Sequence, residues 1–222
     1  MLALVPATQQ ASPQQGPQPG PQSISPADSQ AFSKVEGLGD GTRTFFMFRT
    51  SGHGYTIRAD GFAERSGIGK GRPANFSLRV GEKGHIVRLY FLEHEGDLLL
   101  IYEASLKQIE FELGWGYVVR LNQKTLKTKW AAPVSDLNLG PGLVEGNDVY
   151  FSAANLLARM DLRTGAYVWQ QGDVQRRYSL SLDGFQLPSI TGDRVFFHED
   201  GDKGKSIEID KVTGKVLSVR DR

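Results

Sequence analysis

The sequence predicts an all-β fold made of repeated four-stranded antiparallel units, and three observations support this prediction. The motif Asp-x-x-Thr-Gly occurs at residues 161–165 and 210–214, and a weaker copy with Asn first and Leu last occurs at 122–126. Positions 161 and 210 are 49 residues apart, and positions 122 and 161 are 39 apart. These spacings bracket the period of about 40–45 residues that four-stranded propeller blades show. The chain also has 26 glycines and 10% aromatic residues, a composition typical of β structure with many turns.

Composition limits the functions to consider. With 222 residues, 39% apolar and 23% charged, the chain is long enough to bury one ordinary core. A net charge of +1 gives no basic field for nucleic acid, so we expect no nucleic-acid partner. The absence of cysteine excludes disulfides, thiolate metal sites and cysteine nucleophiles, and leaves the redox compartment open. No window approaches the roughly 18 apolar residues of a transmembrane helix, so none is expected.

Residues 1–40 are rich in Gln, Pro, Ser and Gly. Such a segment buries too little apolar surface to offset the entropy of ordering, so we interpret it as a disordered tether. Residues 1–7 are mildly apolar and are compatible with the remnant of an export signal. We therefore expect a periplasmic or secreted protein, with the cytoplasm left open, and a β domain over residues 41–222.

The first part of this domain, residues 43–84, does not carry the motif but has strand patterns. Residues 44–49 and 55–58 are rich in aromatic and β-branched side chains, and residues 75–80 alternate with period two. The glycine-rich stretch 67–73 predicts a loop between strands. This region is compatible with a degenerate fourth unit.

The repeat itself begins near His85. The first unit has strands near 85–92, 98–102, 117–121 and 126–130, with an irregular excursion over 103–116 that could hold a helical turn. The second unit has strands near 149–152, 156–162 and 166–170 after a lead-in at 140–144. The third has strands near 195–197, 206–209 and 215–219, after an insertion around 175–183 that explains the longer spacing.

The motif itself is predicted to be structural. An Asp can accept hydrogen bonds from the backbone of a turn, and Gly allows the positive φ that a tight turn requires. The motif would join the third strand to the fourth, and the aromatic residue that ends the fourth strand, Trp130 or Trp169, would cover the seam with the next unit. Ser218 stands where the last unit would have its Trp, which is typical of a terminal repeat.

Residues 146–151 with 161–169, and residues 192–197 with 210–216, resemble the quinoprotein-type (PQQ-like) β-propeller repeat. The resemblance covers about residues 85–222 and implies a β-propeller-like array of four-stranded blades, with three clear units. The family includes quinone-dependent alcohol dehydrogenases and the lipoprotein scaffold of the outer-membrane assembly machine, usually with seven or eight blades. This chain would therefore be a small four-bladed propeller or an open array that a partner or a second copy covers.

No catalytic, cofactor-binding or metal site is predicted, and no cofactor is expected. The stretch 67–72 lacks the spacing and context of a phosphate-binding loop, and 199–204 lacks the closing Glu of a calcium loop. The four histidines, at positions 53, 85, 94 and 198, are scattered, and neighbouring acids on a strand point to opposite faces.

The sequence favours a non-catalytic binding or scaffold protein of the bacterial envelope that acts on protein partners, with a homo-oligomer expected if the ring of blades is open. The alternative is a divergent enzyme, either a quinoprotein-like oxidoreductase fragment or a hydrolase with its site on the rim. Convergence of the four histidines with Glu103 and Glu110 in one pocket would favour the enzyme. The binding site is expected in the segments that do not repeat, residues 44–84, 103–116 and 175–185.

Overall fold

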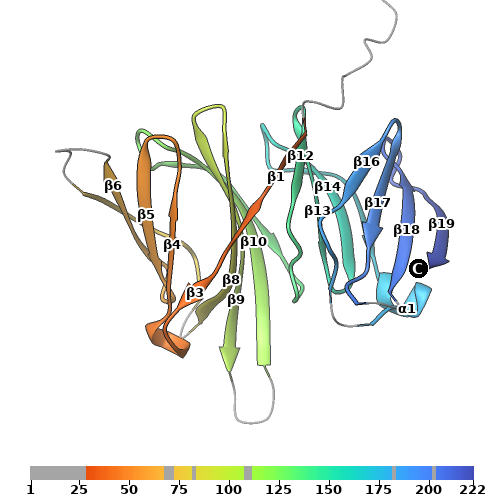
Figure 1. The fold of residues 1–222 in the computed structure, drawn as a ribbon, viewed down its shortest axis with the longest axis horizontal. Helices are drawn as coiled ribbons and strands as arrows, with labels where there is room; N and C mark the ends of the chain where they lie inside the picture. Colours follow the sequence, from red (N-terminus) through yellow and green to blue (C-terminus); the bar gives the residue numbers. More distant parts are fainter. Residues whose placement is uncertain (1–28, 68–72, 82–83, 108–111, 182–183, 202–203) are drawn as a thin grey trace, which may run out of the picture.

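The computed structural model describes residues 29–67, 73–81, 84–107, 112–181, 184–201 and 204–222. Within them the chain forms four antiparallel sheets that stand side by side (Figure 1). Each sheet has four sequential strands, so the predicted array of four-stranded antiparallel blades is confirmed. In fold the protein is a β-propeller-type array.

The blades follow one another in the sequence. Blade 1 comprises β4 (Phe45–Arg49), β5 (His53–Arg58), β6 (Phe62–Gly67) and β7 (Ala74–Ser77), which confirms the degenerate fourth unit. Blade 2 comprises β8 (His85–His94), β9 (Asp97–Lys107), β10 (Glu112–Asn122) and β11 (Thr128–Val134). Blade 3 comprises β12 (Leu143–Glu145), β13 (Asp148–Ala153), β14 (Leu156–Asp161) and β15 (Tyr167–Gly172). Blade 4 comprises β16 (Ser189–Thr191), β17 (Arg194–His198), β18 (Lys205–Asp210) and β19 (Val216–Asp221).

Two local expectations need correction. The excursion expected over residues 103–116 is replaced by the long strands β9 and β10, which pair from Asp97–Asn122 as far as Lys107–Glu112. Extended structure gives the paired residues of this stretch ladder hydrogen bonds along the whole hairpin, which a single helical turn would not.

The predicted insertion holds the helix α1 (Val174–Tyr178), and η2 (Gly41–Arg43) is a short 3₁₀ turn before blade 1.

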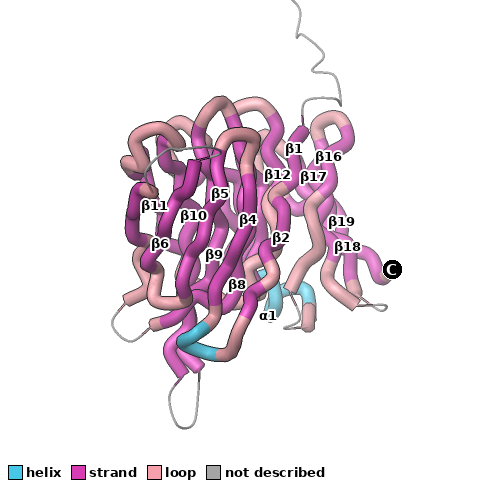
Figure 2. Tube along the Cα trace, turned by 60° about the vertical axis from the view of Figure 1, so that its left-hand side comes forward, coloured by secondary structure: helices cyan, strands magenta, loops and turns pink. Residues whose placement is uncertain are grey.

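The predicted tether also extends too far. Residues 1–28 lie outside the described part of the chain, but β1 (Ser29–Ala31), β2 (Ser33–Val35) and β3 (Gly37–Leu38) are strands. Each pairs antiparallel with the first strand of a different blade: β1 with β12, β2 with β8, and β3 with β4. We call residues 29–38 the N-terminal strap, and Figure 1 shows it crossing the array obliquely, while Figure 2 shows β2 beside β8.

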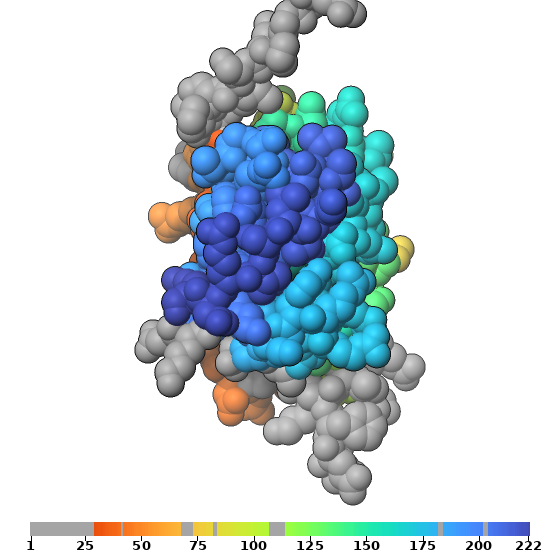
Figure 3. All heavy atoms as spheres, turned by 90° about the vertical axis from the view of Figure 1, so that its right-hand side faces the viewer, coloured from red at the N-terminus to blue at the C-terminus, as the bar shows by residue number. Residues whose placement is uncertain are grey.

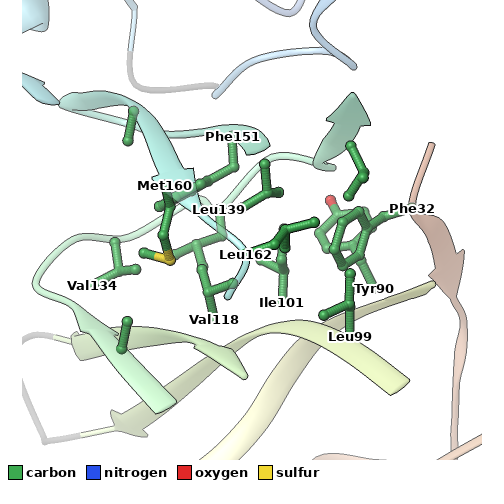
Figure 4. Close-up of a cluster of buried hydrophobic side chains, with 14 of the residues drawn as sticks. Phe32, Tyr90, Leu99, Ile101, Val118, Val134, Leu139, Phe151, Met160 and Leu162 are labelled. Atoms are coloured by element: carbon green, nitrogen blue, oxygen red, sulfur yellow. The ribbon is translucent and has the colours of Figure 1, made fainter. Parts of the chain in front are cut away.

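The strap is stabilised by two side chains in an otherwise polar segment. Phe32 is 5% exposed and packs between blades 2 and 3, next to Tyr90 in Figure 4, and Val35 is 6% exposed and packs between blades 1 and 2. Burial of a Phe or Val side chain contributes roughly 1.5–3 kcal/mol. Together with ladder hydrogen bonds, these two contacts offset the entropy that composition alone suggested would keep the segment disordered.

Three apolar clusters fill the three seams between consecutive blades. One joins blades 1 and 2 through Phe46, Ile57 and Leu100, one joins blades 2 and 3, and one joins blades 3 and 4 through Leu157 and Ile207. Blades 1 and 4 lie at opposite ends of the row (Figure 1). In the described part of the chain the ring of blades is therefore open.

Candidate functional site

The Asp-x-x-Thr-Gly motif forms a rigid turn at the place the sequence predicted, between the third and fourth strands of a blade. In blade 3, Oδ1 of Asp161 accepts hydrogen bonds from the backbone N–H groups of Arg163 and Thr164, both at 2.9 Å, and from the Thr164 hydroxyl at 3.1 Å. Gly165 closes the turn with φ of 71° and donates its N–H to the Asp161 carbonyl at 2.8 Å. The side chain of Arg163 and the turn donors lower the pKa of Asp161 to about 2. The carboxylate is therefore occupied as a structural acceptor.

Blades 2 and 4 repeat this geometry. Oδ1 of Asp210 accepts from the N–H and the hydroxyl of Thr213, both at 2.8 Å, and Oδ1 of Asn122 accepts from the N–H of Thr125 at 2.9 Å. An amide oxygen thus replaces the carboxylate without loss of the turn. We call these three turns, residues 122–126, 161–165 and 210–214, the seam turns.

Each seam turn is also the place where the preceding blade docks. The indole Nε1 of Trp130 in blade 2 donates to the Leu162 carbonyl of blade 3 at 2.8 Å. The indole of Trp169 in blade 3 donates to the Lys211 carbonyl of blade 4 at 3.0 Å. The missing side chains of Gly165 and Gly214 make room for the rings, because a Cβ at either position would lie 2.6 Å from an indole carbon. The predicted role of both tryptophans is confirmed.

An arginine on the third strand supports each contact, and the sequence analysis missed it. Arg120 donates to the same Leu162 carbonyl at 2.9 Å, and Arg159 donates to the same Lys211 carbonyl at 2.9 Å. In blade 1 the equivalent Arg65 donates to the Gln123 carbonyl of blade 2. The signal was present in the sequence, because Arg120 and Arg159 each stand two residues before the first residue of a motif.

The first and last blades depart from this pattern. In blade 4 the register places Ser218 opposite Glu208, where blade 3 has Trp169 opposite Arg159. Glu208 accepts a hydrogen bond from Ser218 at 2.8 Å and lies 3.7 Å from Arg220, so its partners come from its own blade. Figure 3 shows this end of the array, which β16–β19 cover. The outer face of blade 4 therefore lacks the groups that hold a seam turn.

At the other end, the outer face of blade 1 exposes three large apolar side chains beside charged ones such as Arg49 and Glu64. Phe45 is 42% exposed, Met47 58% and Phe62 38%, and these residues alternate with side chains that point into the seam with blade 2. The two ends of the array are thus chemically different.

A pocket of about 430 Å³ lies where β8 and the segment leading into β12 meet the strap and the segment leading into β16. Its apolar lining includes Phe32, Leu139 and Phe185, and its polar lining includes Lys34 and Arg88. Arg88 is held in place, since its guanidinium donates to the Leu139 carbonyl at 3.0 Å and lies 3.7 Å from the buried carboxylate of Glu103. A concave surface with an apolar floor and a few polar groups is the usual form of a binding site.

The candidate catalytic residues do not converge on this pocket. His53 lies in blade 1, His85 and His94 lie at opposite ends of β8 in blade 2, and His198 lies in blade 4, where burial lowers its pKa. Glu103 supports the pocket through Arg88, and Glu110 lies outside the described residues. Residues 68–72 and 202–203 of the two glycine-rich loops weighed above are likewise outside them. In the described part of the chain, no three His, Asp or Glu side chains are grouped as metal ligands.

The sequence analysis found part of the pocket. Gly184 and Phe185 belong to a segment where a site was expected, whereas Phe32 and Lys34 were assigned to the tether. A Phe and a Val three residues apart in a polar stretch were the available signal for the strap.

Comparison with known proteins gives similarity to solved structures alone. No family model and no curated protein matches the chain. Among solved structures, it is similar to BamB from Moraxella catarrhalis, with 13% identity and a TM-score of 0.48 over 76% of this chain and 49% of BamB. It is also similar to a europium-containing methanol dehydrogenase, with 14% identity and a TM-score of 0.39 over 62% of this chain and 27% of that one. A third match, the computationally designed protein Ika8, has 7% identity and a TM-score of 0.30 over 84% and 90% of the two chains.

The chain spans about half the length of the BamB structure that it matches. The likeness concerns the fold alone, and the array of four-stranded antiparallel blades is established by the sheets of this chain.

Proposed function

We propose that this protein is a non-catalytic binding or scaffold protein of the bacterial envelope, which uses its propeller-type blades to bind another protein. The observation that carries the proposal is the use of the motif residues. The reactive-looking Asp161, Trp130 and Arg120 all bond to seam turns or their carbonyls. The repeat thus builds a rigid support, and the pocket at the first strands offers a surface on it.

The chain is similar in fold to BamB and to the methanol dehydrogenase. One fold can serve many functions, so the function is argued from the site. None of the helical segments in the described residues is long and apolar enough to cross a membrane. Periplasmic placement and association with a second copy over the open ends of the array are part of the proposal.

The experiment is a calorimetric titration of the purified full chain with calcium and pyrroloquinoline quinone, separately and together. A binding or scaffold protein gives no saturable heat with either. Tight binding with one quinone and one calcium per chain would contradict the proposal and support the alternative, a divergent quinoprotein-like oxidoreductase. Light scattering on the same sample measures the association of the chain with itself.

A further inference from the structure

The first strand of each blade has one edge that faces away from the second strand, and the strap covers this edge in three of the four blades. In blade 3, Gln30 of the strap pairs with Val144, and the N–H of Phe32 donates to the Gly142 carbonyl at 2.9 Å. Alternate residues of an antiparallel ladder bond to the same neighbour. The backbone N–H and C=O groups of Gln30 and Phe32 therefore point toward β12, and those of Ala31 point away from it.

Blade 4 offers the same edge. The hairpin between β16 and β17 has a two-residue turn with Gly192 at φ of 60°, as the hairpin between β12 and β13 has Gly146 at φ of 59°. Ile190 therefore holds the position of Val144, and its N–H and C=O point away from β17. In the described part of the chain, β16 pairs with β17 alone.

The oblique course of the strap explains the difference. β3 pairs near the start of β4, whereas β1 already pairs with Glu145, the last residue before the hairpin turn of blade 3. The strap thus reaches the turn end of the first strand of blade 3, and none of residues 29–38 pairs with β16.

The pocket of about 430 Å³ lies directly beside this edge. Gln186 and Leu187, two of its lining residues, come just before β16 in the sequence. A strand that pairs antiparallel with β16 would run from Ile190 toward Leu187, so its later side chains would reach the pocket. Leu187, which is 38% exposed, gives the pocket an apolar wall for a large apolar side chain, and Phe32 and Phe185 are buried behind it.

We infer that β16 and this pocket together bind an extended segment of a partner protein by strand addition. The residue opposite Ile190 supplies the backbone hydrogen bonds, and an aromatic or large aliphatic side chain two residues later enters the pocket. The strap is the model for the ligand. On blade 3 the backbone of Gln30 pairs with the first strand, and the side chain of Phe32, two residues later, is buried beside it. Backbone pairing gives affinity in this mode of recognition, and side-chain pockets give specificity. The inference rests on the proposed function and names the kind of partner.

The test uses the full chain and a fluorescein-labelled peptide with the sequence of residues 29–35, Ser-Gln-Ala-Phe-Ser-Lys-Val. Fluorescence anisotropy should show saturable binding. Replacement of the peptide Phe by Ala should weaken binding about tenfold or more, because a buried aromatic side chain is lost. N-methylation of the peptide Gln, whose N–H faces β16, should abolish binding, whereas N-methylation of the peptide Ala should leave it unchanged.

Variants of the protein locate the site. Ile190→Pro removes the N–H that faces the peptide and keeps the ladder with β17, so binding should be lost. Ile190→Val is the matched control and should bind as the parent does. If Ile190→Pro fails to fold, the two N-methylated peptides still decide the question.

Three results would overturn the inference: no binding, equal binding of both N-methylated peptides, or full binding to folded Ile190→Pro. The last would mean that the peptide exchanges with the strap on blade 3. None of these results affects the titration with calcium and quinone, so the inference can fail while the proposed function stands.

Discussion

The contact between Trp130 and Gly165 gives the sharpest prediction about stability. Replacement of Gly165 by Ala imposes two separate costs. The position has φ of 71°, and an L-residue in this region costs about 1–2 kcal/mol. The new Cβ would also lie 2.6 Å from Cδ2 of Trp130, and displacement of a packed ring costs typically 1–3 kcal/mol. Gly165→Ala should therefore lower the free energy of unfolding by about 2–5 kcal/mol.

Gly146→Ala is the matched control. Gly146 has φ of 59°, and no atom lies within 4 Å of the position a Cβ would take, so only the backbone cost applies. Urea unfolding of the two variants should differ by about 1–3 kcal/mol. In a Trp130→Ala background the excess cost of Gly165→Ala should disappear, because the ring is gone. Equal destabilisation by Gly165→Ala and Gly146→Ala, in both backgrounds, would refute the reasoning.

Three further predictions test other parts of the array. Trp169→Ala should cost about 3–5 kcal/mol in urea unfolding, since the ring is 8% exposed, whereas Val168→Ala, at a 47% exposed position on the same strand, should stay within about 0.5 kcal/mol. The folded-state pKa of Asp161, about 2, lies below the unfolded value of about 3.9, so its stabilisation is complete above about pH 4 and is lost as the pH falls toward 2. Asp161→Asn, which keeps the acceptor as Asn122 does, should flatten the dependence of stability on pH in that window; an unchanged acid slope would contradict this assignment. Phe32→Ala should speed hydrogen exchange of the strap backbone while exposed Ser33→Ala does not, and equal exchange in both variants would mean that the strap is held without its aromatic anchor.

Much of the fold could be predicted because residues close together in the sequence specify the turn that repeats from blade to blade. Asp161 with Gly165 specifies a turn through contacts within five residues, and its return at Asp210 gives the spacing of the blades. The role of Trp169 followed from its place at the end of the fourth strand. Period-two alternation also indicated strands in blade 1, where the motif is absent.

The strap could not be predicted from its own composition, because what orders it lies elsewhere. Residues 29–38 pair with β12, β8 and β4, which begin between 7 and 114 residues further along the chain. Propensity and hydropathy describe a segment in isolation, whereas β structure depends on the edge that receives it. The pocket shares this origin, since Phe32 meets Leu139 and Phe185 only when the strap is in place.

The contacts at the seam turns were also predicted only in part. The motif predicted the turn, but not that the Leu162 carbonyl accepts from both Trp130 and Arg120 of another blade. Ser218 was recognised in the sequence as a terminal departure, but Glu208, which takes the place of the arginine, is identified only by the register.

The central claim is that the motif holds the blades together while a partner strand binds at β16 and the pocket beside it. Site-specific photocrosslinking in cells tests it most directly, with a benzophenone side chain at Leu187, beside the pocket, or at Val212, which is 68% exposed on a seam turn. We predict a defined crosslinked protein from position 187, suppressed by excess strap peptide, and none from position 212. Crosslinking to the same proteins from both positions, or from position 212 alone, would contradict the account.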